Sequence, residues 1–454
     1  MKVALVSLGC SRTLVDSEVA LGGLAGHGWT VVPDVEGADV AIVNTCGFIQ
    51  EAKEESIETI LRLCELKKKG KLGAVVVLGC LAQRYGKEIA EEIREADAVV
   101  GTNNYGDLAK ILTTLKIGTR RAAPLHKPPQ KIFRVDPKPY YLLDENTPRY
   151  SLTPDYFAYV KISEGCINAC SYCVIPQMKG AHRSRPVESI VNEVRVLAKQ
   201  KKLSEINLVG QDTAAYGFDR DRTFQLPRLL DELAGLKLIP WIRLLYAHPG
   251  HVTEELIDVI ARHPSLCKYV DFPIEHSHDA MLKRMNRGVT REKMDWGLRK
   301  MRRRIPGVGI RTTLIVGFPG ETEEEFEDLL RFLKEHRFDR LGAFKFSAEE
   351  GARAFKMDGQ IPEPLKQERY DRVMELQQGI SRSLNENWIG RTTAVLVEEK
   401  EEGEDAVYRG RTERDAPEVD GQVIVHSEKT LSPGQFVDVR ITDALEYDLI
   451  GEAE

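Results

Sequence analysis

The sequence predicts an α/β protein in three parts: an N-terminal parallel α/β sheet domain, a central partial (β/α)6 barrel and a small antiparallel β-barrel. Two observations predict the first two parts, because two long stretches each alternate short β-branched runs with amphipathic runs, as in a parallel sheet covered by helices. A third observation predicts the last part, where short strand-like runs are separated only by turns. The chain has 454 residues, enough for about three domains with their own cores.

The N-terminal domain is expected over residues 1–118. Its strands are predicted at KVALVSL, DVAIVN, AVVVLG and DAVVG, with helices between them, one running through Leu24 and one over 51–69. This order gives a parallel sheet with helices on both faces.

Three cysteines of this domain, Cys10, Cys46 and Cys80, each follow a predicted strand. They are expected at the carboxyl edge of the sheet, where open α/β folds bind their ligands. A single buried cysteine is ordinarily a small apolar packing residue. We expect Cys64 and Cys267 to be packing residues of this kind. Three thiols at one edge instead favour a three-thiolate cluster site.

A linker is expected over residues 119–151, because seven of the chain's 21 prolines lie between Thr119 and Pro154. Prolines at this density favour a connection between domains over a helix or a strand.

The second α/β stretch, residues 152–383, has six strand-like runs, at YVKIS, INLVGQ, WIRLLYA, YVDFPI, IRTTLIVGF and RLGAFKF. Six strands suggest a partly closed parallel barrel, although the pattern is also compatible with eight. The turn GFPGETEEEF has Thr322 and Glu325 at capping-box spacing, so a helix is expected to start there. The turn lacks the lysine of a phosphate-binding loop, and a tight turn explains Gly320 at least as well as a ligand does.

The stretch CINACSYC places Cys166, Cys170 and Cys173 in one loop after the first barrel strand. Active-site groups of such barrels gather at this end of the strands. Thiolates select zinc or an iron-sulfur cluster, and a closed site wants four ligands, so three thiols indicate a centre with one open position. The alternative is an incomplete zinc knuckle, which is disfavoured because no second Cys-x-x-Cys pair follows.

The C-terminal part, residues 384–454, is predicted to be a small barrel of the oligonucleotide-binding shape with strands at TTAVLVEE, AVYRGRT, GQVIVH and QFVDVRIT. It contains 7 Lys plus Arg against 18 Asp plus Glu, a net charge of −11, which leaves +5 for the rest of the chain. An acidic module is a poor clamp for nucleic acid and suits a basic protein partner better. A merely solvated acidic face is the alternative.

Composition points to a soluble protein, because 42% of residues are hydrophobic, 30% are charged and no apolar run approaches the ~20 residues of a membrane span. The start, MKVALVSLGC, is read as a first strand rather than a signal peptide. Eight cysteines without a secretory signal favour a reducing compartment. We therefore expect a cytoplasmic protein.

The cysteine loop, with Tyr172 before its last cysteine, resembles the signature of radical S-adenosylmethionine (SAM) enzymes. The order of three strand-end cysteines, cysteine loop and small β module resembles the methylthiotransferases over nearly the whole chain. Local segments are similar to the branch that modifies an aspartate of small-subunit ribosomal protein twelve: VSLGCSRTLVDSE, IPQMKGAHRSRP, LVGQDTAAYG, WIRLLYAHP, FDRLGAFKFSAEEG and DAPEVDG. The tRNA-modifying branch usually has a TRG-type segment where this chain has Met178, Lys179 and Gly180.

The chain departs from this family at two positions. It has Thr13 where the family usually has Asn, and Glu275 where the family commonly has Gln before the histidine. Neither departure removes a predicted cluster ligand, but no polar role is carried onto these positions.

The resemblance implies two 4Fe-4S clusters, an auxiliary one on Cys10, Cys46 and Cys80 and one on Cys166, Cys170 and Cys173 whose fourth iron binds SAM. It implies that SAM serves both as methyl donor and as source of a 5′-deoxyadenosyl radical, which abstracts hydrogen from the β-carbon of the target aspartate. The C-terminal module would be a TRAM domain. No catalytic residue beyond the cluster ligands is expected.

The partners implied are ribosomal protein twelve as substrate, an electron donor and a sulfur donor, with no membrane and no direct nucleic acid. Candidates for the SAM pocket are Tyr172, Gln211, His248, Gly317 and Phe318. The pair Arg183 and Arg185 is expected either to meet an acidic group of substrate or SAM, or to be an exposed helix start.

Rival readings come from four classes. A tRNA adenosine methylthiotransferase keeps the chemistry and changes the substrate. A cobalamin-dependent radical enzyme is disfavoured because the N-terminal domain has no Asp-x-His-x-x-Gly. A non-catalytic iron-sulfur carrier and a zinc protein are the remaining alternatives.

Overall fold

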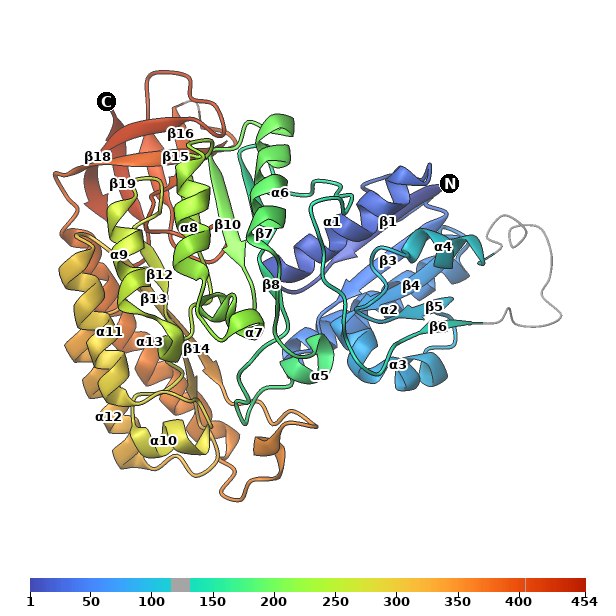
Figure 1. The fold of residues 1–454 in the computed structure, drawn as a ribbon, viewed down its shortest axis with the longest axis horizontal. Coiled ribbons are helices and arrows are strands. Elements are labelled where there is room, and N and C mark those ends of the chain that lie inside the picture. The colour runs from blue at the N-terminus through green and yellow to red at the C-terminus, as the bar shows by residue number, and fades with distance from the viewer. Residues whose placement is uncertain (116–130, 405) are drawn as a thin grey trace.

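The computed structural model describes residues 1–115, 131–404 and 406–454, which form three packed bodies in chain order (Figure 1). The N-terminal body is one parallel sheet with the strand order β2-β1-β3-β4-β5-β6. Its elements are β1 Lys2–Ser7, α1 Ser11–Gly26, β2 Thr30–Val31, β3 Val40–Thr45, α2 Gln50–Lys68, β4 Ala74–Gly79, α3 Cys80–Glu92, β5 Ala98–Val100, α4 Leu108–Thr113 and β6 Ile132–Arg134.

The central strands β3 and β4 are buried at all six positions, as their unbroken β-branched runs predict. Helices α1 and α4 pack on one face of the sheet, and α2 and α3 pack on the other. The ends of β1, β3 and β4 lie in register, because Ser7 pairs with Asn44 and Thr45 pairs with Gly79. The loops that follow these three strands therefore leave the sheet side by side.

The linker prediction was wrong for residues 132–134, because β6 pairs with β5 and extends the N-terminal sheet. Three residues give no readable alternation, and the prolines around them favoured a loop. The two-residue strand β2 was missed for the same reason. Residues 119–130 of the predicted linker lie outside the described residues.

The central body contains the six predicted strands, β7 Phe157–Lys161, β10 Glu205–Val209, β11 Trp241–Leu244, β12 Tyr269–Asp271, β13 Gly309–Val316 and β14 Arg340–Lys345. They form two parallel ladders, β7-β10-β11 and β12-β13-β14. The ladders meet at β11 and β12, where Ile242 bridges Leu266 and the Ala247 N–H donates to the Asp271 carbonyl. The prediction of a partial six-stranded barrel is confirmed.

Helices cover the outside of this barrel and bury the largest apolar core of the chain. They are α6 Val187–Gln200, α8 Leu226–Gly235, α9 Glu254–Arg262, α10 Asp279–Arg284, α11 Arg291–Arg304, α12 Glu323–His336 and α13 Glu363–Glu386. The short helix α7 Phe218–Asp221 has no buried residue. The capping box predicted for α12 is present, since Thr322 and Glu325 each bond the other's backbone. The cysteine loop contains α5 Ile175–Lys179 and is closed by the short antiparallel pair β8 Ser163–Glu164 and β9 Arg183–Ser184.

The C-terminal body is a closed barrel of β15 Thr392–Lys400, β16 Val407–Arg411, β17 Val423–His426, β18 Phe436–Ala444 and β19 Leu449–Ala453, in the order β15-β16-β17-β19-β18. The small barrel was predicted correctly, but β19 was missed, because LIGEA is a short run that glycine and glutamate interrupt. The pairing of β17 with β19 is parallel, whereas the other pairs are antiparallel.

The loop between β16 and β17, residues 412–422, closes the amino-terminal end of the central barrel. Its Asp415 pairs with Arg340, its Asp420 accepts from the Tyr269 hydroxyl, and its Glu413 carbonyl accepts from Arg243. This loop is called the floor loop below. It leaves the opposite, carboxyl-terminal end of the strands to face the N-terminal body.

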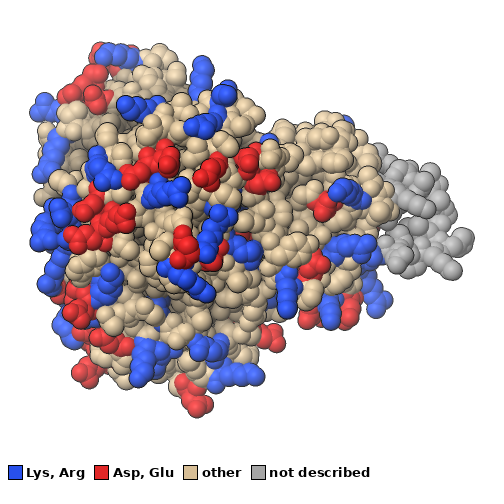
Figure 2. Space-filling view, viewed as in Figure 1, with Lys and Arg blue, Asp and Glu red and all other residues tan. Residues whose placement is uncertain are grey.

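Within the described parts of the chain, no helix is long and apolar enough to cross a membrane. Lys and Arg side chains are interspersed with Asp and Glu over the face seen in Figure 2.

Candidate active site between two cysteine triads

The N-terminal sheet and the central barrel enclose a cavity of about 380 Å³ between them. Six of the eight cysteines line it, and they come from both bodies. The first triad is Cys10, Cys46 and Cys80, and the second triad is Cys166, Cys170 and Cys173. The structure therefore brings the two predicted sets of thiols to one cavity.

The first triad is placed by the strand ends that lie in register. Cys10 caps α1, Cys80 opens α3, and the Cys46 N–H donates to Ser56 Oγ at 3.1 Å. Gly9 and Gly79 precede two of these cysteines, and each has a φ of +102°. A side chain at Gly79 would lie 2.3 Å from Asn44 Oδ1, so this turn requires glycine at that position.

Arginine distinguishes Cys10 from its neighbours. Burial raises the pKa of the Cys10 thiol, but the Arg12 guanidinium and its hydrogen bond from Nε to Sγ at 3.4 Å outweigh burial and lower the pKa to about 6. Burial dominates at the other two, raising the pKa of Cys80 to about 12 and that of Cys46 above its usual value. The three thiols thus differ in their readiness to ionise.

The second triad lies in a loop held by its own hydrogen bonds. Cys166 Sγ accepts from the Asn168 N–H at 3.4 Å, and Cys173 Sγ accepts from the Ile175 N–H at 3.4 Å. Burial raises the pKa of Cys166 to about 11 and that of Cys173 to about 12. Arg287 reaches Cys170, donating from Nη1 to Sγ at 3.5 Å.

Three of the predicted SAM-pocket residues, Tyr172, Gln211 and His248, line the cavity. The described residues Gly317 and Phe318 do not. Phe318 is fully buried in a separate apolar cluster, and the Gly317 N–H donates to Glu321. Both directly follow β13, which ends at Val316, and Gly317 has a φ of +73°.

His248 presents one defined tautomer to the cavity. Its Nδ1 accepts from the Gly250 N–H at 3.0 Å, so the proton of the neutral ring is on Nε2. Burial lowers the pKa of His248 to about 3, which keeps the ring neutral near pH 7. Nε2 is buried and has no hydrogen-bond partner among the described residues, and the same holds for Gln211 Oε1. These two atoms therefore offer a ligand one donor and one acceptor.

Sequence reasoning missed several charged residues that line the cavity. They are Arg12, Lys179, Arg287 and Arg311. Arg12 lies two residues after Cys10, and that spacing was the signal available. Arg287 and Arg311 gave no local signal, because only the fold brings them to the cysteines.

One strand end joins both triads. After β10, the Gly210 carbonyl accepts from Arg12, Gln211 donates to Glu164, and Asp212 accepts from Asn168 at 2.7 Å. Three consecutive residues thus contact the first triad's arginine, the junction between the bodies and the second triad's loop.

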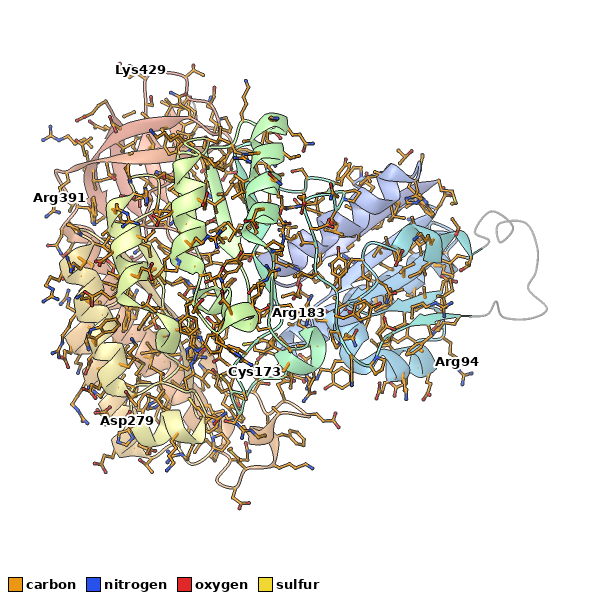
Figure 3. The ribbon with its side chains drawn as sticks, viewed as in Figure 1. Arg94, Cys173, Arg183, Asp279, Arg391 and Lys429 are labelled. Atoms are coloured by element: carbon orange, nitrogen blue, oxygen red, sulfur yellow. The ribbon has the colours of Figure 1, made fainter. Side chains whose placement is uncertain are left out.

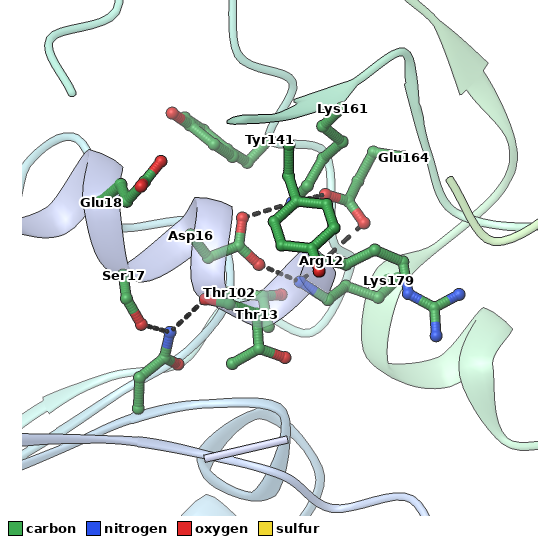
Figure 4. Close-up of polar contacts among 12 residues, drawn as sticks. Arg12, Thr13, Asp16, Ser17, Glu18, Thr102, Tyr141, Lys161, Glu164 and Lys179 are labelled. Carbon is green, nitrogen blue, oxygen red and sulfur yellow. Dashed lines mark hydrogen bonds and ion pairs between the residues drawn. The ribbon is translucent and has the colours of Figure 1, made fainter. Parts of the chain in front are cut away.

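The junction between the two bodies is a buried network of charges (Figure 4). Asp16 of α1 pairs with Lys161 of β7 and, at 2.8 Å, with Lys179 of α5, and Lys161 also pairs with Glu164 at 2.8 Å. All four side chains are at most 5% exposed. The network fixes the N-terminal body against the cysteine loop.

The Arg183 and Arg185 pair is neither an exposed helix start nor part of the cavity lining among the described residues. Arg185 is fully buried and pairs with Glu193, and Arg183 donates to the backbone carbonyls of Lys179 and Tyr141. Figure 3 shows Arg183 and Cys173 at the junction of the N-terminal body and the barrel. Cys64 and Cys267 pack in apolar clusters, as predicted.

The fold and the two triads define a radical SAM protein with a TRAM domain, and three family models match the chain accordingly. The model described as Radical SAM superfamily matches residues 160–333, and the model described as TRAM domain matches 389–453. The model described as Uncharacterized protein family UPF0004 matches residues 2–101.

Close relatives narrow this class to one family. The chain is 46% identical over 452 residues to "Ribosomal protein uS12 methylthiotransferase RimO" of Clostridioides difficile (strain 630), covering 100% of this chain and 98% of that one. The protein of the same name from Desulforamulus reducens is 46% identical over 450 residues, covering 99% of both chains. The chain belongs to the family of the ribosomal protein uS12 methylthiotransferase RimO.

Solved structures share the fold at low identity. The radical SAM methyltransferase TsrM from Kitasatospora setae, solved with cobalamin and a [4Fe-4S] cluster, has a TM-score of 0.53 at 18% identity, covering 76% of this chain and 74% of that chain. The cobalamin-dependent radical enzyme OxsB in its apo form has a TM-score of 0.52 at 12% identity, covering 84% and 56%. These similarities show the fold alone.

Proposed function

We propose that this chain is a radical SAM enzyme that adds a methylthio group to the β-carbon of one aspartate in ribosomal protein uS12. The observation that carries this proposal is the pair of three-thiol sets facing one cavity of about 380 Å³. The full-length similarity to uS12 methylthiotransferases supports uS12 as substrate and disfavours the alternative, a tRNA adenosine.

The donor sets fit two 4Fe-4S clusters. Cys10, Cys46 and Cys80 would hold the auxiliary cluster, and Cys166, Cys170 and Cys173 would hold the SAM-binding cluster. Thiolates are the ligands that such clusters use. The two remaining cysteines lie in apolar clusters away from the cavity, so each set has three thiols and leaves one iron for a ligand.

When bound, the clusters and SAM supply the one-electron chemistry that an unactivated carbon requires. The chain's own residues would bind SAM and orient it beside the clusters. His248 Nε2 and Gln211 Oε1 would meet polar groups of SAM, with Tyr172 beside the cysteines. Arg12 and Arg287 donate to one sulfur in each triad. Apolar residues such as Phe48, Ile175 and Phe344 reduce the access of water to the cavity.

The same proposal includes the domain bounds, the cellular compartment and the other partners. Residues 1–118 would carry the auxiliary cluster, 119–151 would link the bodies, 152–383 would form the radical SAM core and 384–454 the TRAM domain. The chain would act in the cytoplasm with an electron donor and a sulfur donor as partners.

A reconstituted reaction tests the substrate. Purified uS12 and bulk tRNA are each incubated with the iron-loaded chain, SAM, sulfide and a chemical reductant, and both are analysed by mass spectrometry. A methylthio mass increment on one aspartate of uS12 is expected. An increment on tRNA adenosine, with uS12 unchanged, would overturn the proposal in favour of the tRNA branch.

Iron content tests the ligand sets independently of activity. Replacing either triad by alanine should halve the bound iron, and replacing Cys64 and Cys267 should leave it unchanged. Retention of all the iron after loss of one triad would contradict the assignment.

A further inference from the structure

A groove separate from the cysteine cavity runs between α2 and α3 on the outer side of the N-terminal body, with a volume of about 460 Å³. From α2 its lining residues include Lys53, Glu54, Ile57 and Leu61, and from α3 and the residue that follows it they include Leu81, Tyr85, Glu88, Ile89, Glu92 and Ile93. The triad chemistry uses none of these side chains.

The groove has an apolar floor that is open to solvent. Ile57 is 39% exposed and Leu61 is 48% exposed, although both are large aliphatic side chains. The floor is completed by Leu81 and Ile89 of α3 and by Ile93 just after it. Large exposed aliphatic residues that line a groove mark an interaction surface more often than scattered ones do.

The rim of the groove is acidic. Glu54, Glu88 and Glu92 line it and are exposed, and among the described residues neither Glu88 nor Glu92 has an ion pair. Lys53, which also lines the groove, does not offset them, because it pairs with the buried Glu349 at 2.8 Å. The groove therefore favours a partner segment that carries positive charge.

The groove adjoins the cysteine cavity at two places, where neighbouring residues of the chain line one and the other. A smaller cavity of about 180 Å³, lined by Phe48, Ile49 and Phe346, shares Phe48, Tyr172 and Glu275 with the main one. Immediately after Phe48 and Ile49, Gln50 opens α2 and lines the groove. On the other side, α3 opens with Cys80 in the cavity, and the next residue, Leu81, lines the groove.

We propose that this groove holds a basic, partly apolar segment of the protein substrate while the adjoining target aspartate enters the cysteine cavity. The inference rests on the proposed function. Along α2 the lining runs from Gln50 to Leu61, a rise of roughly 16 Å at 1.5 Å per residue. An extended peptide would span this length with about five residues.

The negative charge of the groove favours a basic protein segment over nucleic acid as the occupant. Nucleic acid binds through contacts between cations and phosphate, which three exposed glutamates oppose. The C-terminal barrel is the other acidic surface of the chain, with a net charge of −11 over 384–454. It lies at the far end of the molecule from α2 and α3 (Figure 1), so the two surfaces can be tested separately.

The test measures steady-state methylthiolation of uS12 by the full, iron-loaded chain. The charge-reversal variant E54K/E88K/E92K and the floor variant I57S/L61S are compared with a matched control, E232K/E255K/E324K, at exposed positions of α8, α9 and α12. Both groove variants should raise KM for uS12 about tenfold with kcat within about twofold. The control should leave KM within about twofold, and cleavage of SAM without uS12 should be unchanged in all three.

The dependence of KM on ionic strength provides a second test. Added salt should raise KM of the wild type, and this dependence should be weaker in E54K/E88K/E92K, because rim charges act through screened attraction.

Three outcomes would overturn the inference while leaving the proposed function intact. The groove variants could keep the wild-type KM, the control could raise KM as much as they do, or the loss could appear only with a protein electron donor, which would make that donor the occupant. If the wild type fails to modify uS12, the proposed function fails and the inference fails with it.

Discussion

The side chain of Arg12 contacts both bodies that enclose the cavity. Its Nε donates to Cys10, its Nη1 donates to the Gly210 carbonyl at 3.1 Å, and its guanidinium stacks 4.4 Å from the centre of the Tyr246 ring. Gly210 and Tyr246 both belong to the central barrel. The residue that tunes the first triad is therefore held by the body that carries the second.

Replacing Arg12 should change the reactivity of Cys10. In the iron-free protein at pH 7, Cys10 should be alkylated faster than Cys46 or Cys80, because its pKa is about 6 while burial raises theirs. The variant Arg12→Gln should slow alkylation of Cys10 at least about tenfold, measured by mass spectrometry of iodoacetamide-treated protein. Arg94→Gln, an exposed change in the same body, is the control, and equal rates in both variants would contradict the role of Arg12.

Burial of His248 should make stability depend on pH. Its pKa falls from 6.5 to about 3 on folding, so the unfolded chain binds the extra proton between these values, and stability is lost as pH falls from 6.5 toward 3. Between these two values the free energy of unfolding should fall by about 1.4 kcal/mol for each pH unit of acidification. Urea unfolding of the iron-free protein should show a shallower acid loss in His248→Asn than in the wild type. His426→Asn, on an exposed position of β17, should unfold as the wild type does, and a wild-type slope in His248→Asn would refute the assignment.

At the scale of elements, α1 joins the two bodies through charged side chains. Its Asp16 and Glu18 are buried, and they pair with Lys161, Lys179 and Arg149 from the chain that follows the N-terminal body. Such pairs are costly to break because one partner stays buried and charged. The helix therefore fixes where the first triad faces the second.

Breaking this network should be measurable in a double-mutant cycle. Asp16→Leu should destabilise the protein by about 3 kcal/mol, because Lys179 loses its closest partner. Combining Asp16→Leu with Lys179→Met should cost less than the sum of the two single changes, as judged by urea unfolding. Asp107→Asn, which breaks an exposed pair with Lys110, should cost under about 1 kcal/mol. Additive costs for Asp16 and Lys179 would show that the pair is not coupled.

At the scale of the whole molecule, the cysteines were the part of the site that the sequence predicted best. Cys10, Cys46 and Cys80 follow strands whose β-branched runs are unambiguous, and parallel strands end at one edge. Arg287 and Arg311 were not predictable, because Arg287 reaches Cys170 from a loop more than a hundred residues away in the chain. Contacts of that kind depend on how elements pack and leave no local pattern.

The strands β6 and β19 were not predicted from the sequence, and the reason is the same for both. β6 and β19 are short and lie at positions where a neighbouring strand supplies most of the ordering, β5 for the first and β17 and β18 for the second. Tertiary pairing overrides weak propensity in such cases. The six barrel strands were predicted correctly because each is flanked by a helical pattern of its own.

Removing the C-terminal body should unfold the barrel rather than merely weaken substrate binding. A chain ending at residue 386 would lose the floor loop and Arg411, leaving Glu205 and Arg340 without partners that they now have at 2.7 Å and 2.6 Å. Loss of one partner from a buried ion pair costs about 3–5 kcal/mol, and Glu205 would keep only Arg243, so we expect broad, non-cooperative thermal unfolding by circular dichroism. Arg340→Gln in the full chain is the milder comparison and should unfold cooperatively at a lower temperature. A sharp transition in the shortened chain would refute this expectation.

The floor loop also bears on how the protein is made. Residues 412–422 leave the ribosome after the whole of the central barrel has been synthesised, and the N-terminal body is complete long before them. A nascent chain therefore has its thiols in place while the opposite end of the barrel is still open, and a segment translated after the barrel is the one that shuts it.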